Sequence, residues 1–317
     1  QSRFSVFLFN QLMNQPLTFS LMASVSKLAD ELDAQQFPQS ALYVIATPIG
    51  NMSDISLRAL KVLSMVDAIA CEDTRNTSVL MSRLGLSTPL FSAHQHNERE
   101  SAEKIIGRLR QGERIALVSD AGTPAISDPG TRIVDAVIEA GLRVIPIAGA
   151  SAGIAALSAS GLITDEFHFI GFLPHKATQR AQLLSRLAQS TATLVIYEAP
   201  HRILETAAAL ADALESTRRV VIAREISKLF EQIHRCTLRE LHAWLAMAPA
   251  HQKGEFVLLI EAAAMSNEND LSEATRVLSI LLESNSVSQA AAVAARITGV
   301  KKNTLYELAL KMQSSNE

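Results

Sequence analysis

The sequence predicts an α/β protein in which a mostly parallel first sheet and a mixed second sheet are followed by a small helical module. Three observations support this. From Leu42 onward, short apolar runs alternate with breakers and amphipathic helical patterns. In the second half, two apolar runs near 220 and 230 have no helix between them, which indicates antiparallel strands. After Ala264, a polar linker leads into three short helical patterns, at 271–284, 287–297 and 301–312.

The first domain is expected to span residues 40–162, with strands at 42–46, 66–70, 90–91, 115–118 and 142–147. Five strands with four intervening helices predict a doubly wound sheet. Such a sheet binds its ligand outside the carboxyl ends of its strands, so the loops that leave these ends are expected to share a pocket. These loops are Thr47–Asp54, Cys71–Arg75 and Asp120–Gly130.

The stretch Arg114–Gly130 combines a buried strand, a tight turn and a helix start. Gly122 has no side chain, so a ligand can approach its backbone closely. Ser127 or Asp128 is expected to cap a helix that begins near Pro129. The alternative is an ordinary loop between a strand and a helix.

The second domain is expected at 163–264, with strands at 167–172, 193–197, 220–223, 229–235 and 255–260, and helices at 177–188, 200–214 and 237–246. The module at 265–317 resembles a helix-turn-helix, with the basic pair Lys301-Lys302 beside its last turn. A packing or dimer element is the alternative for this module.

Composition limits the functional classes. The 317 residues are 48% hydrophobic with a net charge of −3, so the chain is globular and any site for a polyanion must be local. Two cysteines, Cys71 and Cys236, exclude a disulfide framework and suit a reducing cytoplasm.

Residues 1–39 are expected to be a loosely ordered extension, with Met13 and Met22 as alternative starts. The apolar run Phe4–Phe9 is too short to span a bilayer, so no membrane partner is expected.

Several familiar sites are missing from the sequence. There is no Gly-x-Gly-x-x-Gly fingerprint and no P-loop, which argues against a standard dinucleotide fold or a P-loop nucleotide hydrolase. Another nucleotide-cofactor enzyme, with Glu72 or Asp73 holding a ribose hydroxyl, stays open. His94-Gln-His96 lacks further ligands nearby, so a structural or substrate-facing role is favoured and no metal is expected.

Six motifs point to a family. The chain resembles the small-subunit ribosomal RNA 2′-O-ribose methyltransferases, the cytidine-modifying branch of the tetrapyrrole methylase superfamily, from about Leu42 to its C-terminus. The motifs are Leu42–Asp54, Cys71–Arg75, Ser119–Gly130, Tyr197–Arg202, Ala223–Lys228 and Lys253–Phe256.

The resemblance implies a homodimeric two-domain enzyme with S-adenosyl-L-methionine in the cleft between its domains. One departure is Ala148-Gly149-Ala150, where the family usually has Pro-Gly-Pro or Pro-Gly-Ala, and the lost proline makes the loop before Ser151 less rigid. The cofactor positions that the resemblance implies are Pro48, Ala121, Gly122, Thr123, Ile126, Ser151, Ala152, Glu198 and Ile226.

The implied reaction is methylation of the 2′-hydroxyl of a cytidine in 16S ribosomal RNA. A sulfonium cofactor carries no phosphates, so main-chain atoms of a turn suit it better than a cationic cradle. The protein must mainly align oxygen, carbon and sulfur, although a general base would help a weak hydroxyl nucleophile. Asp73 is the candidate base, with Asp120 and Glu225 as rivals, and a structural pair between Asp73 and Arg75 is the alternative.

Basic residues are expected to line the path of the RNA and to contact phosphates without reading sequence. Two other functions stay open: a methylase of a small, tetrapyrrole-like molecule, and a non-enzymatic RNA-binding factor. The residues predicted for the RNA path are Arg75, Lys176, Arg180, Arg202, Lys228, Lys301 and Lys302.

Overall fold

The structure, a computed structural model, describes residues 23–162, 165–264 and 267–314. The chain divides into two compact units. The larger unit consists of Gln1–Ala188 and Thr193–Glu261 and holds both sheets, and the smaller unit consists of Gln189–Ala192 and Ala262–Glu317. Among the described residues, no helix has both the length and the apolar character needed to cross a bilayer.

The first sheet is parallel throughout and has the strand order β3-β2-β4-β1-β5. Its strands are β1 (Ala41–Ile45), β2 (Ala68–Cys71), β3 (Leu90–Ser92), β4 (Arg114–Val118) and β5 (Arg143–Ile147). The connecting helices are η1 (Met52–Asp54), α2 (Leu57–Met65), α3 (Thr74–Arg83), α4 (Glu98–Arg110) and α5 (Thr131–Glu139).

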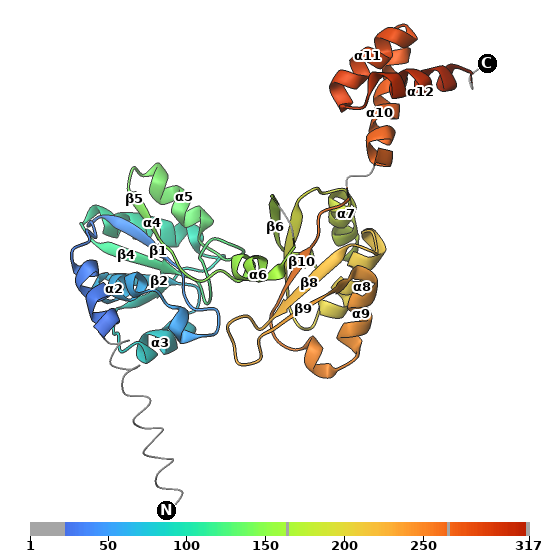
Figure 1. The fold of residues 1–317 in the computed structure, drawn as a ribbon. Helices are drawn as coiled ribbons and strands as arrows, with labels where there is room; N and C mark the ends of the chain where they lie inside the picture. Colours follow the sequence, from blue (N-terminus) through green and yellow to red (C-terminus); the bar gives the residue numbers. More distant parts are fainter. Residues whose placement is uncertain (1–22, 163–164, 265–266, 315–317) are drawn as a thin grey trace, which may run out of the picture. The chain divides into compact units, whose positions relative to one another are not determined.

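Both faces of this sheet are covered, as Figure 1 shows, and this explains the continuous apolar strands. Alternate residues of β1 point to opposite faces: Tyr43 and Ile45 pack with Val62 and Leu63 of α2, whereas Leu42 packs with residues of α4 and α5. The predicted doubly wound parallel sheet is therefore confirmed.

The second sheet has the order β6-β7-β10-β8-β9. Only β6 and β7 pair in parallel, and β8 and β9 form the antiparallel pair that the sequence predicts near 220 and 230. Its strands are β6 (Phe167–Phe172), β7 (Thr193–Glu198), β8 (Arg219–Arg224), β9 (Gln232–Thr237) and β10 (Phe256–Ile260). Its helices are α6 (Ala152–Ser160), α7 (Ala177–Leu187), α8 (Ile203–Ala213), α9 (Leu238–Ala246) and η2 (Pro249–Gln252).

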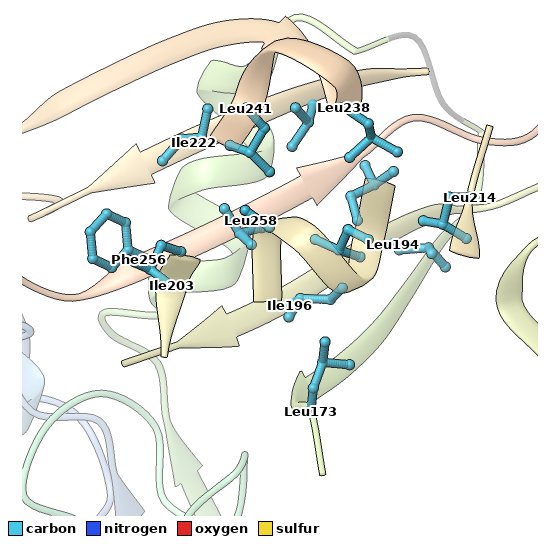
Figure 2. Packing of buried hydrophobic residues seen from close by; sticks show 14 of the residues in the cluster. Leu173, Leu194, Ile196, Ile203, Leu214, Ile222, Leu238, Leu241, Phe256 and Leu258 are labelled. Atoms are coloured by element: carbon cyan, nitrogen blue, oxygen red, sulfur yellow. The ribbon is translucent and has the colours of Figure 1, made fainter. Parts of the chain in front are cut away.

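A large apolar core lies between this sheet and its helices. Figure 2 shows Ile196 of β7, Ile222 of β8 and Leu258 of β10 facing Ile203 of α8 and Leu241 of α9, and all five side chains are fully buried. Fully burying one such side chain contributes about 1.5–3 kcal/mol, so this core stabilises the second sheet strongly. Residues at one edge of that sheet line the site described below.

Helix α6 covers the opposite face of the second sheet. Ala156 packs with Val195, Val221 and Leu259, so by its packing α6 belongs to the second domain rather than to the first, where residues 40–162 were expected to lie. The chain therefore changes domain in the loop before Ala152.

The smaller unit contains three helices, α10 (Asn267–Leu282), α11 (Val287–Thr298) and α12 (Lys302–Ser314). Their shared core contains Leu278, Ala291, Ala294 and Leu305, all fully buried. Gly299 ends α11 with a φ of 75°, a conformation that glycine adopts without strain, and α12 begins three residues later.

The structure differs from the expected elements at three places. Residues 23–33 form a helix instead of a loose extension, whereas residues 1–22 lie outside the described part of the chain. Helix α5 starts at Thr131, and neither Ser127 nor Asp128 caps it; the buried Glu98 accepts a hydrogen bond from the Gly130 amide at 2.7 Å instead. Strand β9 starts at Gln232 rather than 229 because Lys228–Glu231 form a turn, in which the Glu231 amide donates to the Lys228 carbonyl at 3.1 Å.

Candidate active site

Two loops at the carboxyl edge of the first sheet are joined by backbone hydrogen bonds. The Thr47 amide donates to the Gly122 carbonyl at 2.8 Å, and the Gly122 amide donates to the Thr47 carbonyl at 3.1 Å. A third loop joins them, since the Asp73 amide donates to Asp120 Oδ1 at 3.2 Å. The predicted convergence of the three loops is confirmed, because parallel strands place their carboxyl ends along one edge.

A cavity of about 440 Å³ lies between this edge and the second sheet. The turn after β4 lines one side, and Tyr197, Ala199 and Phe256 line the other. Pro48 is not among the lining residues, although its neighbour Ile49 is. The predicted cofactor positions that line the cavity are Ala121, Gly122, Thr123, Ile126, Ser151, Ala152, Glu198 and Ile226.

Gly122 has a different role from the one expected. Its amide and carbonyl are both bonded to Thr47, so main-chain contacts to a ligand fall to its neighbours Ala121 and Thr123. A Cβ atom at Gly122 would lie 3.5 Å from Ile49 Cγ2, which is ordinary contact. The turn needs glycine chiefly because φ is 77°.

Backbone strain is concentrated in the two loops beside the cavity. Ala125 and Ser127 have φ angles of 68° and 61°, and Glu225 and Ser227 have 52° and 66°. Positive φ costs a non-glycine residue free energy and persists where surrounding contacts hold it. The side chains of Ser127 and Glu225 each pack against a glycine that leaves room for them. A Cβ atom on Gly171 would lie 2.6 Å from Ser127 Oγ, and one on Gly254 would lie 2.6 Å from Glu225 Cδ.

The loop Ala148-Gly149-Ala150 is held without the proline that the family usually has. Thr123 Oγ1 donates to the Ala150 carbonyl at 3.1 Å, and a Cβ atom on Gly149 would lie 2.9 Å from Ala46 Cβ. The hydrogen bond and the close approach to β1 constrain the segment that leads to Ser151.

The charge of the cavity wall is negative. Carboxylates line it, and the residues that form the wall include no lysine or arginine. Burial raises the pKa of Asp128 to about 6, with the charges of Glu72 and Asp120 adding to the shift. Burial also raises the pKa of Glu72. The lining acids are Glu72, Asp120, Asp128, Glu198 and Glu255.

Such a wall suits a cationic ligand. It attracts a sulfonium or an ammonium group and repels a phosphate. The site therefore fits S-adenosylmethionine, which is positively charged at sulfur, better than the phosphate-bearing cofactor of the other nucleotide enzyme considered above.

Asp73, the predicted base, caps helix α3. Its carboxylate accepts from the Arg75 amide at 2.8 Å and from the Arg75 guanidinium at 2.6 and 3.1 Å, and these bonds lower the pKa of Asp73 to about 2. It does not line the cavity. The geometry favours the structural pair with Arg75 over a basic role.

The rival acids are also engaged. Asp120 lines the cavity, but its two oxygens accept from the Asp73 amide and from Asn76 Nδ2. Glu225 lies in a network with Lys228, which also contacts Glu255 at 2.8 Å.

Two of the cations predicted for the RNA path are buried, which corrects that prediction. Arg202 is 6% exposed, donates to the Leu173 carbonyl at 2.7 Å and lies 3.5 Å from Glu198. Arg180 is 4% exposed and pairs with Glu205. Burial is tolerated because each guanidinium is paired and hydrogen-bonded, so neither faces a nucleic acid.

The other predicted cations differ in their surroundings. Arg75 and Lys176 are exposed, as are Lys301 and Lys302 at the start of α12 in the smaller unit. Lys228 lies against Gly50 across the loops of the two domains, and Ser227 beside it hydrogen-bonds Asp54.

The two histidines that suggest a metal pack against each other instead. The rings of His94 and His96 lie edge to face with centroids 5.8 Å apart. Within the described part of the chain, no three histidine, cysteine or acidic side chains are grouped so as to hold a metal ion.

Sequence reasoning missed the aromatic wall of the cavity. Tyr197 packs edge to face on Phe169 and Phe172, and its hydroxyl accepts from the Gly153 amide at 2.9 Å. Phe256 also lines the cavity. The available signal was the position of these residues at strand ends that face the first domain.

Comparison with known proteins agrees with this geometry. The sequence pattern of the Tetrapyrrole (Corrin/Porphyrin) Methylases matches residues 41–242, and that of the RsmI C-terminal HTH domain matches residues 268–313. The solved structure of the cobalt precorrin-4 methyltransferase CbiF superposes with a TM-score of 0.53 at 18% identity, covering 71% of this chain and 98% of that one. Uroporphyrin-III-C-methyltransferase from Thermus thermophilus gives 0.51 at 17%, covering 70% and 94%. The fold and the matched pattern define a tetrapyrrole methylase.

Relatives with higher sequence identity indicate which family within the tetrapyrrole methylases the chain belongs to. The protein named Ribosomal RNA small subunit methyltransferase I from Pseudomonas aeruginosa is 49% identical over 277 residues, which are 87% of this chain and 98% of that protein. Its namesake from Escherichia coli O157:H7 is 45% identical over 275 residues, covering 87% and 96%. The chain belongs to the family of ribosomal RNA small subunit methyltransferase I, whose methyl donor is S-adenosylmethionine.

Proposed function

We propose that this chain uses S-adenosylmethionine to methylate the 2′-hydroxyl of a cytidine ribose in 16S ribosomal RNA. One observation carries the proposal: the chain matches a ribosomal RNA small subunit methyltransferase I along 98% of that protein's length, helical module included. The anionic cavity is the part of the molecule that suits the cofactor.

A methylase of a tetrapyrrole-like molecule is the second candidate, which the solved neighbours suggest. They are 17–18% identical and support the fold alone, whereas the RNA methyltransferase relatives reach 49%. The helical module at 268–313 also favours the RNA substrate.

The residues around the cavity have to position the two reactants rather than activate the methyl group. When bound, S-adenosylmethionine supplies a methyl group on a positively charged sulfur, which needs no further activation. The protein has to hold the ribose oxygen in line with that carbon and to exclude competing water. Ala121 and Thr123 offer main-chain atoms, Tyr197 and Phe172 offer ring faces and edges, and Ile226 closes the wall from the second domain.

The RNA phosphates are held outside the cavity, since its carboxylates repel them. We assign this role to the exposed cations Arg75, Lys176, Lys301 and Lys302, with Lys228 at the junction of the two loops. Lys301 and Lys302 stand at the N-terminus of α12, where free backbone amides add to their attraction for a phosphate.

We also propose a homodimer in the cytoplasm. Leu229 and Phe230 are 89% and 67% exposed in the loop that leads into β9, which is an edge strand of the second sheet. Neighbouring exposed apolar side chains beside an unpaired strand edge are typical of an interface.

Light scattering tests the dimer with the double variant L229D/F230D, which is expected to halve the mass of the particle. M247D is the matched control, because Met247 is 78% exposed at the C-cap of α9, away from the loop that leads into β9. A wild-type monomer, or a double variant of unchanged mass, would contradict this assignment.

Mass spectrometry of ribosomal RNA tests the main proposal. Small ribosomal subunits from cells that lack the gene are incubated with the purified protein and S-adenosylmethionine, and one cytidine is expected to gain a methyl group on its ribose. Methylation of a base, or none at all, argues against the assignment. Calorimetry that finds no binding of S-adenosylmethionine would favour the non-enzymatic RNA-binding factor.

A further inference from the structure

Two large apolar side chains in the wall of the cavity are open to solvent. Ile126, on the loop after β4, is 46% exposed, and Phe172, the last residue of β6, is 51% exposed. Each is a chain neighbour of the contact between Ser127 and Gly171, so both stand where the two domains meet. Phe256, in the same wall, is only 2% exposed. Phe172 is therefore the phenyl ring of the cavity that a ligand can reach from outside.

The ring behind Phe172 is already engaged. Tyr197 packs edge to face on Phe169 at a centroid distance of 5.1 Å and on Phe172 at 5.8 Å, and its hydroxyl accepts from the Gly153 amide at 2.9 Å. These three contacts fix Tyr197, which in turn supports Phe172. One edge-to-face contact occupies only part of a phenyl ring, so the rest of the Phe172 ring can stack on a planar group.

The backbone directly after Phe172 is held by two buried guanidinium groups. Arg202 donates to the carbonyls of Leu173 at 2.7 Å and Pro174 at 3.3 Å, and Arg180 donates to the Pro174 carbonyl at 3.4 Å. The two arginines do not face the RNA themselves, but they fix the loop that presents the exposed ring. A ring on such a loop is positioned before a ligand arrives.

The same loop carries a cation. Lys176 is exposed four residues after Phe172, and four residues of chain span at most about 14 Å. A nucleotide in RNA offers both a flat base and a phosphate, whereas S-adenosylmethionine has a flat base and no phosphate. An exposed ring and an ammonium group on one loop therefore fit a nucleotide of the RNA better than they fit the cofactor.

The position of the cavity explains why such a nucleotide needs a partner for its base. The methyl donor is assigned to a cavity of about 440 Å³ whose carboxylates repel phosphate, so a ribose has to enter while the rest of the strand stays outside. A nucleotide that is drawn out of its strand loses the stacking on its neighbours. An aromatic side chain at the opening of the cavity can replace that stacking.

We propose that Phe172 is a substrate-binding residue whose ring stacks on the base of the acceptor cytidine, while Lys176 contacts an adjoining phosphate. The inference rests on the proposed function and adds the subsite that holds the acceptor nucleotide. Stacking accepts any base, so Phe172 holds the nucleotide without selecting cytosine.

The test compares F172L with F167L in the full-length protein, using small ribosomal subunits from cells that lack the gene. Leucine keeps an apolar side chain and removes the ring. Phe167 is a matched control because it is 48% exposed on the same strand but pairs with Thr193 at the start of β7, whereas Phe172 pairs with Tyr197 near its end.

We expect F172L to raise the KM for the subunit about 5- to 150-fold, the loss that follows removal of one base–aromatic stack. Its kcat should stay within about threefold of the wild type, because the stack is the same before and during methyl transfer. Its Kd for S-adenosylmethionine should also stay within about threefold by calorimetry, and F167L should match the wild type in all three constants.

Two further variants separate stacking from a merely structural role. F172Y should restore the wild-type KM within about threefold, because a tyrosine ring also stacks on a base. K176A should lower the slope of log K against log salt by about 0.7, the value for one phosphate contact on a single strand. F172L should keep the wild-type slope, because the ring contacts no phosphate.

Three outcomes would overturn the role of Phe172. F172L could share the KM of F167L, it could weaken cofactor binding instead, which would place the ring against the adenine of S-adenosylmethionine, or F172Y could be as impaired as F172L. A K176A variant with the wild-type slope would contradict the phosphate contact. A wild type that binds S-adenosylmethionine but transfers no methyl group to a ribose contradicts the proposed function itself, and it is measured first so that the two failures are distinguishable.

Discussion

At the residue scale, the contact between Ser127 and Gly171 couples the two domains beside the candidate cofactor site. Ser127 belongs to the loop after β4, and Gly171 to the second sheet, where a bulge in β6 shifts the register between Phe169 and Gly171. Neither residue is charged or aromatic. Their importance lies in how closely the Ser127 side chain approaches Gly171, where a Cβ atom would lie 2.6 Å from Ser127 Oγ.

Replacing Gly171 with alanine is expected to weaken cofactor binding about tenfold. The added Cβ atom would lie 2.6 Å from Ser127 Oγ, so the Ser127 side chain must move, in a loop that holds Ser127 at a φ of 61° beside the cavity. Both G171A and the control G141A also pay for a positive φ, about 1–2 kcal/mol of stability each. Gly141 has a φ of 72° but no atom within 4 Å of its Cβ position, so G141A should bind S-adenosylmethionine as the wild type does. Equal calorimetric affinities for the two variants would contradict the coupling.

At the element scale, buried charges organise the carboxyl end of β7 and the start of α8. Glu198 ends β7 and accepts from Thr206 of α8, while Arg202 bridges Glu198 to the carbonyls of Leu173 and Pro174 after β6. This network joins β6, β7 and α8 directly behind the cavity wall that Glu198 and Ala199 provide.

Replacing Arg202 with alanine is expected to cost about 3–5 kcal/mol in the free energy of unfolding, because a buried carboxylate and two carbonyls lose their shared partner. K176A provides the comparison, since Lys176 is exposed at the N-cap of α7 without a capping bond, and it should change stability by less than about 0.5 kcal/mol. Urea denaturation measures both. An R202A variant as stable as K176A would show that Arg202 is not structural and would reopen its place on the RNA path.

At the scale of the whole molecule, catalysis and RNA binding need opposite charge. The cavity wall is acidic, so an RNA strand gains little attraction from it. The basic pair Lys301-Lys302 lies in the smaller unit, which has its own apolar core. Under the proposed assignment of Lys301 and Lys302, separate units let one chain combine an anionic cofactor site with a cationic contact for phosphate.

Neutralising both lysines in the full chain, as K301A/K302A, is expected to weaken RNA binding and to flatten its salt dependence. Each lost phosphate contact removes about 0.7 from the slope of log K against log salt for single strands, so the double variant should lose about 1.4. R83A/R110A removes the same charge at the last turns of α3 and α4, on the edge of the first sheet opposite the loops of the site, and should keep the wild-type slope. If the two double variants behave alike, the helical unit is a packing or dimer element instead.

Much of this molecule could be predicted from the order of its residues. Apolar runs indicated the ten strands of the described residues to within a few positions, because a strand buried between helices leaves a local signal that needs no knowledge of its neighbours. The turn Ala121-Gly122-Thr123 could be recognised for the same reason, since glycine marks a backbone conformation that its own sequence position requires.

Side-chain environment was decided only by the tertiary structure. Arg202 and Lys302 look alike in sequence, yet one is enclosed by Glu198 and two carbonyls while the other faces solvent. Asp73 and Asp128 likewise differ by what folding brings beside them, a guanidinium in one case and a partly buried acidic wall in the other. Sequence by itself determined which backbone elements form and in what order. Charge, burial and pKa depend on residues far apart along the chain, so the packing of the two domains determined which acids line the cavity and which are paired elsewhere.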